Sequence, residues 1–279
     1  MSGMAKLYVV ATPIGNLSDI SARAAQTLRE VAFIAAEDTR VTQKLLNHLE
    51  IKKPMVSCYR HNEQQKMDGI IERILKGDSC ALCCDAGTPA ISDPGDRLVE
   101  KALEAGVEVV PVAGPSAVAA ALSVSGQQSG RYCFEGFLPM NKKQRRQRLD
   151  ALENEDRTMV FFEAPHKLKN TVGDLFAALG DRRVTVAREM TKLHEEVYRN
   201  TLGEAARQCE NSKPRGEYVL VVEGRRREKK SVKTPEQAAV FAKELRKQGS
   251  SASAAAKAAA AETGVAKSEI YRAMRGGEE

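Results

Sequence analysis

The sequence predicts an α/β protein with two α/β domains and a small helical C-terminal domain. In the first half of the chain, short apolar runs alternate with amphipathic helical segments, a pattern that favours helices packed on a largely parallel sheet. The apolar runs are nearly continuous in hydrophobicity, as expected for strands that are covered on both faces. Near residues 115–125 the pattern changes to strand-like runs with fewer helices, which indicates a second, mixed or antiparallel α/β unit.

The expected elements of the first block follow directly from this alternation. Strands are expected at Leu7–Ala11, Val31–Ala35, Met55–Tyr59, Cys80–Cys84 and Val107–Val112. Helices are expected between them, at Ser21–Glu30, Arg40–His48, Gln64–Lys76 and Asp96–Ala105. In the second block, a basic helical stretch around 142–152 precedes strands at Thr158–Phe162, Val184–Arg188, Glu196–Thr201 and Tyr218–Glu223.

The end of the chain is a charged linker followed by helical segments. Thr234 before Pro235 has the pattern of a helix N-cap with proline at the first helical position. Helices are expected at Pro235–Lys247, Ser251–Glu262 and Lys267–Arg275, with a joint like that of a helix-turn-helix between the last two. We therefore expect α/β domains at 1–115 and 116–224, a basic linker at 225–234 and a helical domain at 235–279.

The net charge of +6 lies entirely in this tail. Residues 224–279 hold 13 Lys and Arg and 7 Asp and Glu, so the remaining 30 of each leave residues 1–223 neutral overall. The excess favours a polyanionic partner such as RNA or DNA, although a charge run is often only a solvated linker and an alanine-rich tail can serve packing alone. The composition is that of a globular protein, no apolar run reaches the ~18 residues of a membrane span, and no signal-peptide pattern is seen. We therefore expect a cytoplasmic protein with no membrane partner.

Six cysteines in a chain of 279 residues do not form a disulfide framework. Cys80 and Cys83 have the spacing of a metal or redox pair, but a strand would point them to opposite faces. We expect buried strand cysteines here and no metal site.

Three loops after expected strands are rich in glycine and proline: 11–17, 84–95 and 112–117. The sequence has no P-loop, no Gly-x-Gly-x-x-Gly after the first strand, no zincin histidine pair and no hydrolase elbow. In open α/β sheets, ligands bind beyond the carboxyl ends of the strands. Glycine permits close backbone approach and proline holds a fixed loop shape, so we expect main-chain groups there to bind an adenosine-like ligand.

Seven motifs between residues 6 and 224 occur together. They are Thr12-Pro13-Ile14-Gly15-Asn16-Leu17, Ala36-Glu37-Asp38-Thr39-Arg40, Asp85-Ala86-Gly87-Thr88-Pro89-x-x-Ser92-Asp93-Pro94-Gly95, Pro111-x-x-Gly114-Pro115-Ser116, Glu135-Gly136-Phe137-Leu138-Pro139, Ala187-Arg188-Glu189-x-Thr191-Lys192 and Gly216-Glu217-x-Val219-Leu220-Val221-Val222-Glu223-Gly224. In combination they resemble the bacterial 16S rRNA (cytidine-2′-O)-ribose methyltransferases of the tetrapyrrole (corrin/porphyrin) methylase superfamily. The helical tail resembles the small C-terminal domain of many members.

The resemblance implies a homodimer that binds S-adenosylmethionine between two α/β domains and methylates 16S rRNA of the small ribosomal subunit. Thr88 replaces an acidic residue of the porphyrin enzymes, which is typical of the rRNA branch. The implied cofactor-binding residues are Pro13, Asp85, Ala86, Gly87, Thr88, Pro89, Ser92, Asp93, Gly114, Pro115, Ser116, Ala117, Leu138, Ala164, Pro165, Gly216 and Glu217.

Candidate catalytic residues follow the second and third expected strands. A ribose hydroxyl is a poor nucleophile, so a base or a favourable field should help its proton to leave. Glu37 and Asp38 end the second strand and His61 follows the third. The alternatives are an acid pair that stabilises a helix N-terminus and, for the histidine, a structural hydrogen bond.

Basic side chains near these positions are candidates for RNA phosphates, which arginine and lysine bind well. The candidates are Arg40, Arg60, Lys142, Lys143, Arg145 and Arg146; the alternative for the last four is a solvated helix face. His166 is either a helix-start residue or a neighbour of the cofactor.

Two other functions stay open from the sequence. One is a porphyrinoid C-methyltransferase of the same superfamily, which the loop around Thr88 and the basic tail disfavour. The other is a non-catalytic nucleic-acid-binding protein, which the complete set of cofactor loops disfavours.

Overall fold

The computed structural model describes residues 4–58, 63–210, 213–226 and 234–275. The chain forms two compact units, Met1–Arg225 and Arg226–Glu279, and each is described by itself. Among the described helices, none is both long and apolar enough to cross a membrane.

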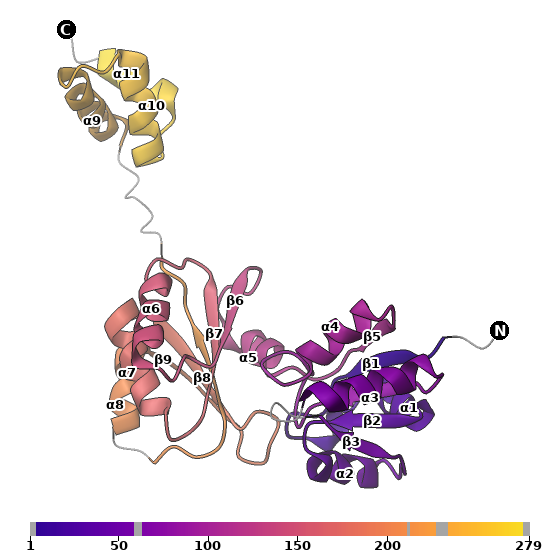
Figure 1. The fold of residues 1–279 in the computed structure, drawn as a ribbon. Helices are drawn as coiled ribbons and strands as arrows, with labels where there is room; N and C mark the ends of the chain where they lie inside the picture. Colours follow the sequence, from indigo (N-terminus) through magenta and orange to yellow (C-terminus); the bar gives the residue numbers. More distant parts are fainter. Residues whose placement is uncertain (1–3, 59–62, 211–212, 227–233, 276–279) are drawn as a thin grey trace. The chain divides into compact units, whose positions relative to one another are not determined.

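The first sheet of unit Met1–Arg225 is parallel throughout, with the strand order β3-β2-β4-β1-β5 (Figure 1). Its strands are β1 (Lys6–Val10), β2 (Phe33–Ala36), β3 (Met55–Ser57), β4 (Cys80–Cys83) and β5 (Glu108–Val112). The connections contain a 3-10 turn η1 (Leu17–Asp19) and the helices α1 (Ala22–Glu30), α2 (Thr39–His48), α3 (Glu63–Leu75) and α4 (Asp96–Glu104). The predicted α/β class and the parallel first sheet are confirmed.

Helices cover both faces of this sheet, which explains the unbroken hydrophobicity of its strands. Leu28 of α1 and Leu46 of α2 pack on one face, whereas Ile70 of α3 packs with α4 on the other. Cys80 belongs to the second of these clusters and Cys83 to the first, and both are buried free thiols. The prediction of buried strand cysteines on opposite faces is confirmed.

The second sheet is mixed, with the order β6-β7-β10-β8-β9. Its strands are β6 (Tyr132–Gly136), β7 (Thr158–Glu163), β8 (Arg183–Arg188), β9 (Glu196–Thr201) and β10 (Tyr218–Val222). Only β6 and β7 run parallel; the other described pairs are antiparallel. The mixed character predicted for this block is confirmed.

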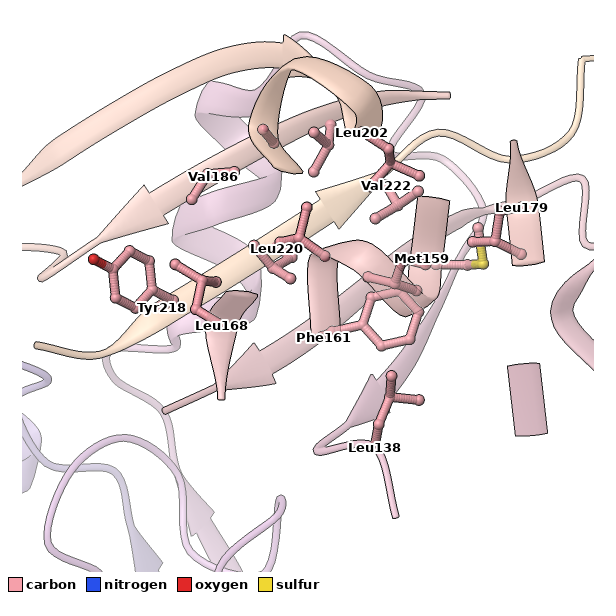
Figure 2. Packing of buried hydrophobic residues seen from close by; sticks show 14 of the residues in the cluster. Leu138, Met159, Phe161, Leu168, Leu179, Val186, Leu202, Tyr218, Leu220 and Val222 are labelled. Carbon is pink, nitrogen blue, oxygen red and sulfur yellow. The ribbon is translucent and has the colours of Figure 1, made fainter. Parts of the chain in front are cut away.

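The prediction of fewer helices in this block than in the first is wrong, because each block has four described α-helices. Helix α5 (Ala117–Ser125) packs on one face of the second sheet, and α6 (Lys142–Leu152), α7 (Leu168–Leu179) and α8 (Leu202–Glu210) pack on the other. Figure 2 shows Phe161 and Leu220 of the sheet packed with Leu168 and Leu202 of the helices. Leu168, Val172, Leu175 and Leu179 recur at helical spacing on the buried side of α7, so tertiary burial supports a helix whose Gly173 and β-branched residues weaken its intrinsic propensity.

Unit Arg226–Glu279 contains α9 (Pro235–Lys247), α10 (Ala252–Thr263) and α11 (Lys267–Arg275). Thr234 forms a capping box with Gln237 at the start of α9, and Gly264 ends α10 in the left-handed conformation. Alanines of α9 and α10 pack with Ile270 of α11. The three helices predicted for the tail are confirmed.

Candidate active site

A cavity of about 520 Å3 lies at the carboxyl ends of the parallel strands. Loops that follow β2, β4, β1 and β5, four neighbours in the first sheet, supply one wall. The other wall comes from residues that follow β7 and β8 and from the start of β10. This volume is within the range of small-molecule sites, and its position agrees with the rule that ligands bind beyond the carboxyl ends of parallel strands.

The cavity gathers many of the residues that the resemblance implies for the cofactor. Those that line it are Asp85, Ala86, Gly87, Thr88, Asp93, Ser116, Ala117, Ala164, Pro165 and Glu217. The implied residues outside this lining are Pro13, Pro89, Ser92, Gly114, Pro115, Leu138 and Gly216; Leu138 lines a neighbouring groove instead.

The loop after β4 is tied to the loop after β1 by reciprocal main-chain hydrogen bonds. The Thr12 N–H donates to the Gly87 carbonyl at 2.8 Å, and the Gly87 N–H donates to the Thr12 carbonyl at 3.1 Å. Gly87 has a φ of 86°, and Ala90 and Ser92 also have positive φ values of 66° and 67°. Such backbone angles are costly for residues other than glycine and occur often at ligand sites. The surrounding hydrogen bonds hold this loop shape.

Gly15 brings the loop after β1 against the loop after β8. A Cβ at this position would lie 2.8 Å from Thr191 Oγ1 and 2.9 Å from the Met190 carbonyl oxygen. Ile14, which precedes Gly15 in the chain, and Met190, whose carbonyl oxygen is one of these contacts, both line the cavity. The absence of a side chain at Gly15 therefore lets the two walls of the cavity meet.

The electrostatic character of the cavity is acidic. Five carboxylates line it, those of Glu37, Asp85, Asp93, Glu163 and Glu217. Burial raises the pKa of Asp85, whose Oδ1 accepts a hydrogen bond from the Asp38 N–H at 3.1 Å. The Asp85 N–H in turn donates to Glu37 Oε2 at 3.2 Å. The loops after β2 and β4 are thus joined at the edge of the cavity.

Lys192 is the only lysine or arginine among the described residues that line the cavity. Its Nζ donates to Glu189 Oε1 and to Glu217 Oε2, each at 2.9 Å. Burial alone would lower the pKa of this ammonium, but the hydrogen bonds and the negative charges of Glu189 and Glu217 together outweigh burial and raise it. Lys192 therefore stays protonated at neutral pH and cannot act as a base there.

The three candidate catalytic residues have different positions. Glu37 lines the cavity, whereas Asp38 is the N-cap of α2 and forms an ion pair with Arg40 at 2.6 Å. The hydrogen bonds from the Arg40 side chain and backbone lower the Asp38 pKa to about 2, so this carboxylate is a poor proton acceptor near neutral pH. His61 lies outside the described residues, as does Arg60.

The basic residues predicted for RNA lie mostly outside the cavity. Arg40 is exposed at the start of α2, and Lys142 and Lys143 are exposed at the start of α6. Arg145 is largely buried and donates from Nε to Asp174 at 2.6 Å, while Arg146 is exposed and pairs with Asp150 along the helix.

Sequence reasoning missed part of the wall that the second sheet supplies. Glu163 is only 3% exposed; one of its carboxylate oxygens accepts from the Ala164 N–H at 2.9 Å and the other from the Thr171 hydroxyl. Met190 and Lys192 lie in the motif at 187–192, whose pattern predicts no role for either side chain. His166, left open from the sequence, also lines the cavity.

Residues 6–206 match the family of tetrapyrrole (corrin/porphyrin) methylases. The chain belongs to this family. It is 45% identical over 274 residues to the ribosomal RNA small subunit methyltransferase I of Xylella fastidiosa, covering 97% of this chain and 99% of that protein. It is also 48% identical to the protein of the same name from Thermotoga maritima, over 222 residues that make up 80% of this chain and 100% of the relative.

Solved structures of this family share the fold at low sequence identity. A cobalt precorrin-4 methyltransferase of cobalamin biosynthesis superposes with a TM-score of 0.61 at 16% identity, covering 80% of this chain and 96% of that chain. The uroporphyrin-III-C-methyltransferase from Thermus thermophilus gives a TM-score of 0.56 at 15% identity, covering 78% and 94%.

Proposed function

We propose that this protein uses S-adenosylmethionine to methylate the ribose 2′-hydroxyl of a cytidine in the 16S rRNA of the small ribosomal subunit. The observation that carries the proposal is the full-length similarity to ribosomal RNA small subunit methyltransferase I, at 45% identity. The cavity adds support, because the loops that carry the resemblance converge on it. We expect a homodimer, from the resemblance alone, and a cytoplasmic setting, from the sequence pattern.

The residues of the cavity fit S-adenosylmethionine in size and charge. The volume of about 520 Å3 suits a ligand of nucleoside size, and the carboxylates of the lining complement its sulfonium and ammonium groups. Gly87 lines one side of the cavity without a side chain, while Ser116 and Ala117 present the start of α5. When bound, the cofactor supplies an electrophilic methyl group.

The protein's own contribution is to position the ribose and to manage its proton. In an in-line displacement, fixed orientation of the reactants can provide much of the rate enhancement. Glu37 is the candidate that both lines the cavity and carries a carboxylate, so we assign it the role of accepting the hydroxyl proton. Lys192, held protonated, would stabilise negative charge on the ribose oxygen or an adjacent phosphate.

The test is transfer of labelled methyl groups from S-adenosylmethionine by the purified full-length protein. The proposal predicts label in the RNA of 30S subunits and none in uroporphyrinogen, an acceptor that represents the porphyrinoid alternative. Glu37→Gln should bind the cofactor but transfer methyl at least ~100-fold more slowly, as expected for loss of a general base. Label in uroporphyrinogen and not in 30S RNA would overturn the proposal in favour of the porphyrinoid alternative.

A further inference from the structure

A groove of about 720 Å3 lies beside α6, α7 and α8 on the second sheet. It is built from the helices that cover one face of this sheet, and the first sheet contributes no residue to its described lining. The proposed reaction assigns this groove no role.

The groove adjoins the active-site cavity through two loops. In the loop after β6, Phe137 lines the cavity and the next residue, Leu138, lines the groove. In the loop after β7, His166 lines the cavity and Lys167 lines the groove. Consecutive Cα atoms are about 3.8 Å apart, so at these loops the two hollows lie on either side of about one residue.

The lining of the groove is basic although residues 1–223 are neutral overall. The positive side chains are Lys142, Arg145, Arg146, Lys167 and Lys169, against the two acidic side chains Asp174 and Glu210. This difference of five and two leaves a local excess of three positive charges. A groove of one charge sign focuses the field toward an anionic partner.

The basic residues divide into a fixed part and an exposed part. Arg145 is held by Asp174 at 2.6 Å and by the Thr171 hydroxyl at 2.8 Å, and Thr171 donates onward to Glu163 in the cavity. This chain of hydrogen bonds makes Arg145 a structural part of the wall between groove and cavity. Lys142 and Lys169 are exposed and therefore accessible to a ligand.

Two further features match a single-stranded nucleic acid. Helix α7 begins at this rim, so the positive end of its helix dipole adds to the positive potential. Phe137, at the junction with the cavity, is 53% exposed. Basic grooves combined with aromatic rings on which bases stack are typical of single-strand binding.

One relative has a counterpart for only part of this chain. The Thermotoga maritima relative is matched over its whole length by 80% of this chain, so it has no counterpart for about a fifth of the chain. A protein with that name must recognise small subunit rRNA with residues of the shared part.

We propose that the phosphodiester backbone of the substrate RNA lies in this groove, where Lys142 and Lys169 contact phosphates and the target nucleotide passes Phe137 into the cavity. This inference rests on the proposed function for the identity of the RNA. In this inference the exposed lysines of the groove contact phosphates, whereas Arg145 stabilises the wall of the groove.

The test compares two double variants of the full-length protein. Lys142→Gln/Lys169→Gln neutralises the groove, and Lys52→Gln/Lys76→Gln is the matched control, because these two exposed lysines lie where strands of the first sheet begin, at the edge away from the cavity. Each variant is measured for binding to 30S subunits over a salt series, for S-adenosylmethionine affinity, and for KM and kcat of methyl transfer.

The expected result is selective loss of RNA affinity in the groove variant. Each phosphate that a lysine neutralises on single-stranded RNA contributes a slope of about 0.7 in log K against log salt. Neutralising both lysines should therefore reduce the slope by about 1.4 and, for equal affinities extrapolated to 1 M salt, weaken binding roughly fifteenfold near 0.15 M salt. KM for 30S subunits should rise in parallel, with kcat and cofactor affinity unchanged. The control should stay within about twofold of the wild type.

Groove-variant binding within twofold of the wild type, or an equal loss in the control, would overturn this inference. If the wild-type protein methylates 30S subunits normally while the groove variant binds like wild type, the proposed function stands and the groove assignment fails. If the wild-type protein transfers no methyl group, the proposed function fails, and the binding series still decides whether RNA occupies the groove.

Discussion

Replacing Gly15 with alanine should weaken cofactor binding by forcing the two walls of the cavity apart. The added Cβ would lie 2.8 Å from Thr191 Oγ1 and 2.9 Å from the Met190 carbonyl oxygen, whereas ordinary contact begins near 3.4 Å. Relieving these two contacts takes a separation of ~0.5–0.6 Å, and the Lys192 Cγ atom, which lies closer still, must move further. Backbone cannot yield as a flexible side chain can, and overpacking of this kind costs about 1–3 kcal/mol.

If the strain is relieved by opening the cavity, S-adenosylmethionine affinity should fall by roughly 5- to 150-fold, since 1.4 kcal/mol corresponds to tenfold. Isothermal titration calorimetry measures this loss, and thermal unfolding measures any strain that persists. The matched control is Gly69→Ala in α3, where a Cβ meets nothing within 4 Å; it should raise stability by about 0.5–1 kcal/mol. Wild-type affinity and melting temperature in Gly15→Ala would refute the close contact.

Three further predictions concern stability, pH and thiol reactivity. Leu220→Ala, at a fully buried position of β10, should lower the free energy of unfolding by about 2–5 kcal/mol. Val240→Ala, at an exposed position of α9, should change it by no more than ~0.5 kcal/mol. Equal losses in the two variants would contradict the packing of Leu220. Asp85→Asn should stabilise the protein at neutral pH, because burial raises the pKa of Asp85 and its ionised form therefore destabilises the fold. The gain in unfolding free energy over the wild type should shrink as pH falls through that pKa and vanish below about 4. A gain that grows on acidification would contradict burial as the cause. Burial raises the pKa of Cys80 and of Cys84 to about 12. A thiol reagent at pH 8 should therefore label these residues only after unfolding. Prompt labelling of the native protein would contradict their burial.

The first wall of the cavity could be predicted from the sequence because it follows from local patterns. A parallel sheet places the carboxyl ends of its strands at one edge, so the loops containing Asp85, Gly87 and Ser116 were expected to lie together. Apolar runs located those strands to within a few residues, and glycine and proline identified the loops.

The second wall could not be derived in this way because it depends on long-range pairing. Lys192 and Glu217 are brought together when β10 pairs with β8 in antiparallel fashion, and no local pattern encodes this register. Arg145 resembles several other cations on a basic helix in the sequence, but Asp174, a residue of α7, holds it in the wall. The sequence leaves Asp38 open between a catalytic role and a helix N-terminus, and the structure decides between them, because this carboxylate caps α2 and pairs with Arg40.

The most direct test of the proposed function is to map the methyl group that the purified protein adds to unmethylated 30S subunits. We expect one modified cytidine in 16S rRNA, with the methyl group on the ribose oxygen, so that the adjacent phosphodiester resists alkaline cleavage. A methyl group on a base, or 16S rRNA that carries no label while the protein binds S-adenosylmethionine, would contradict the proposed function.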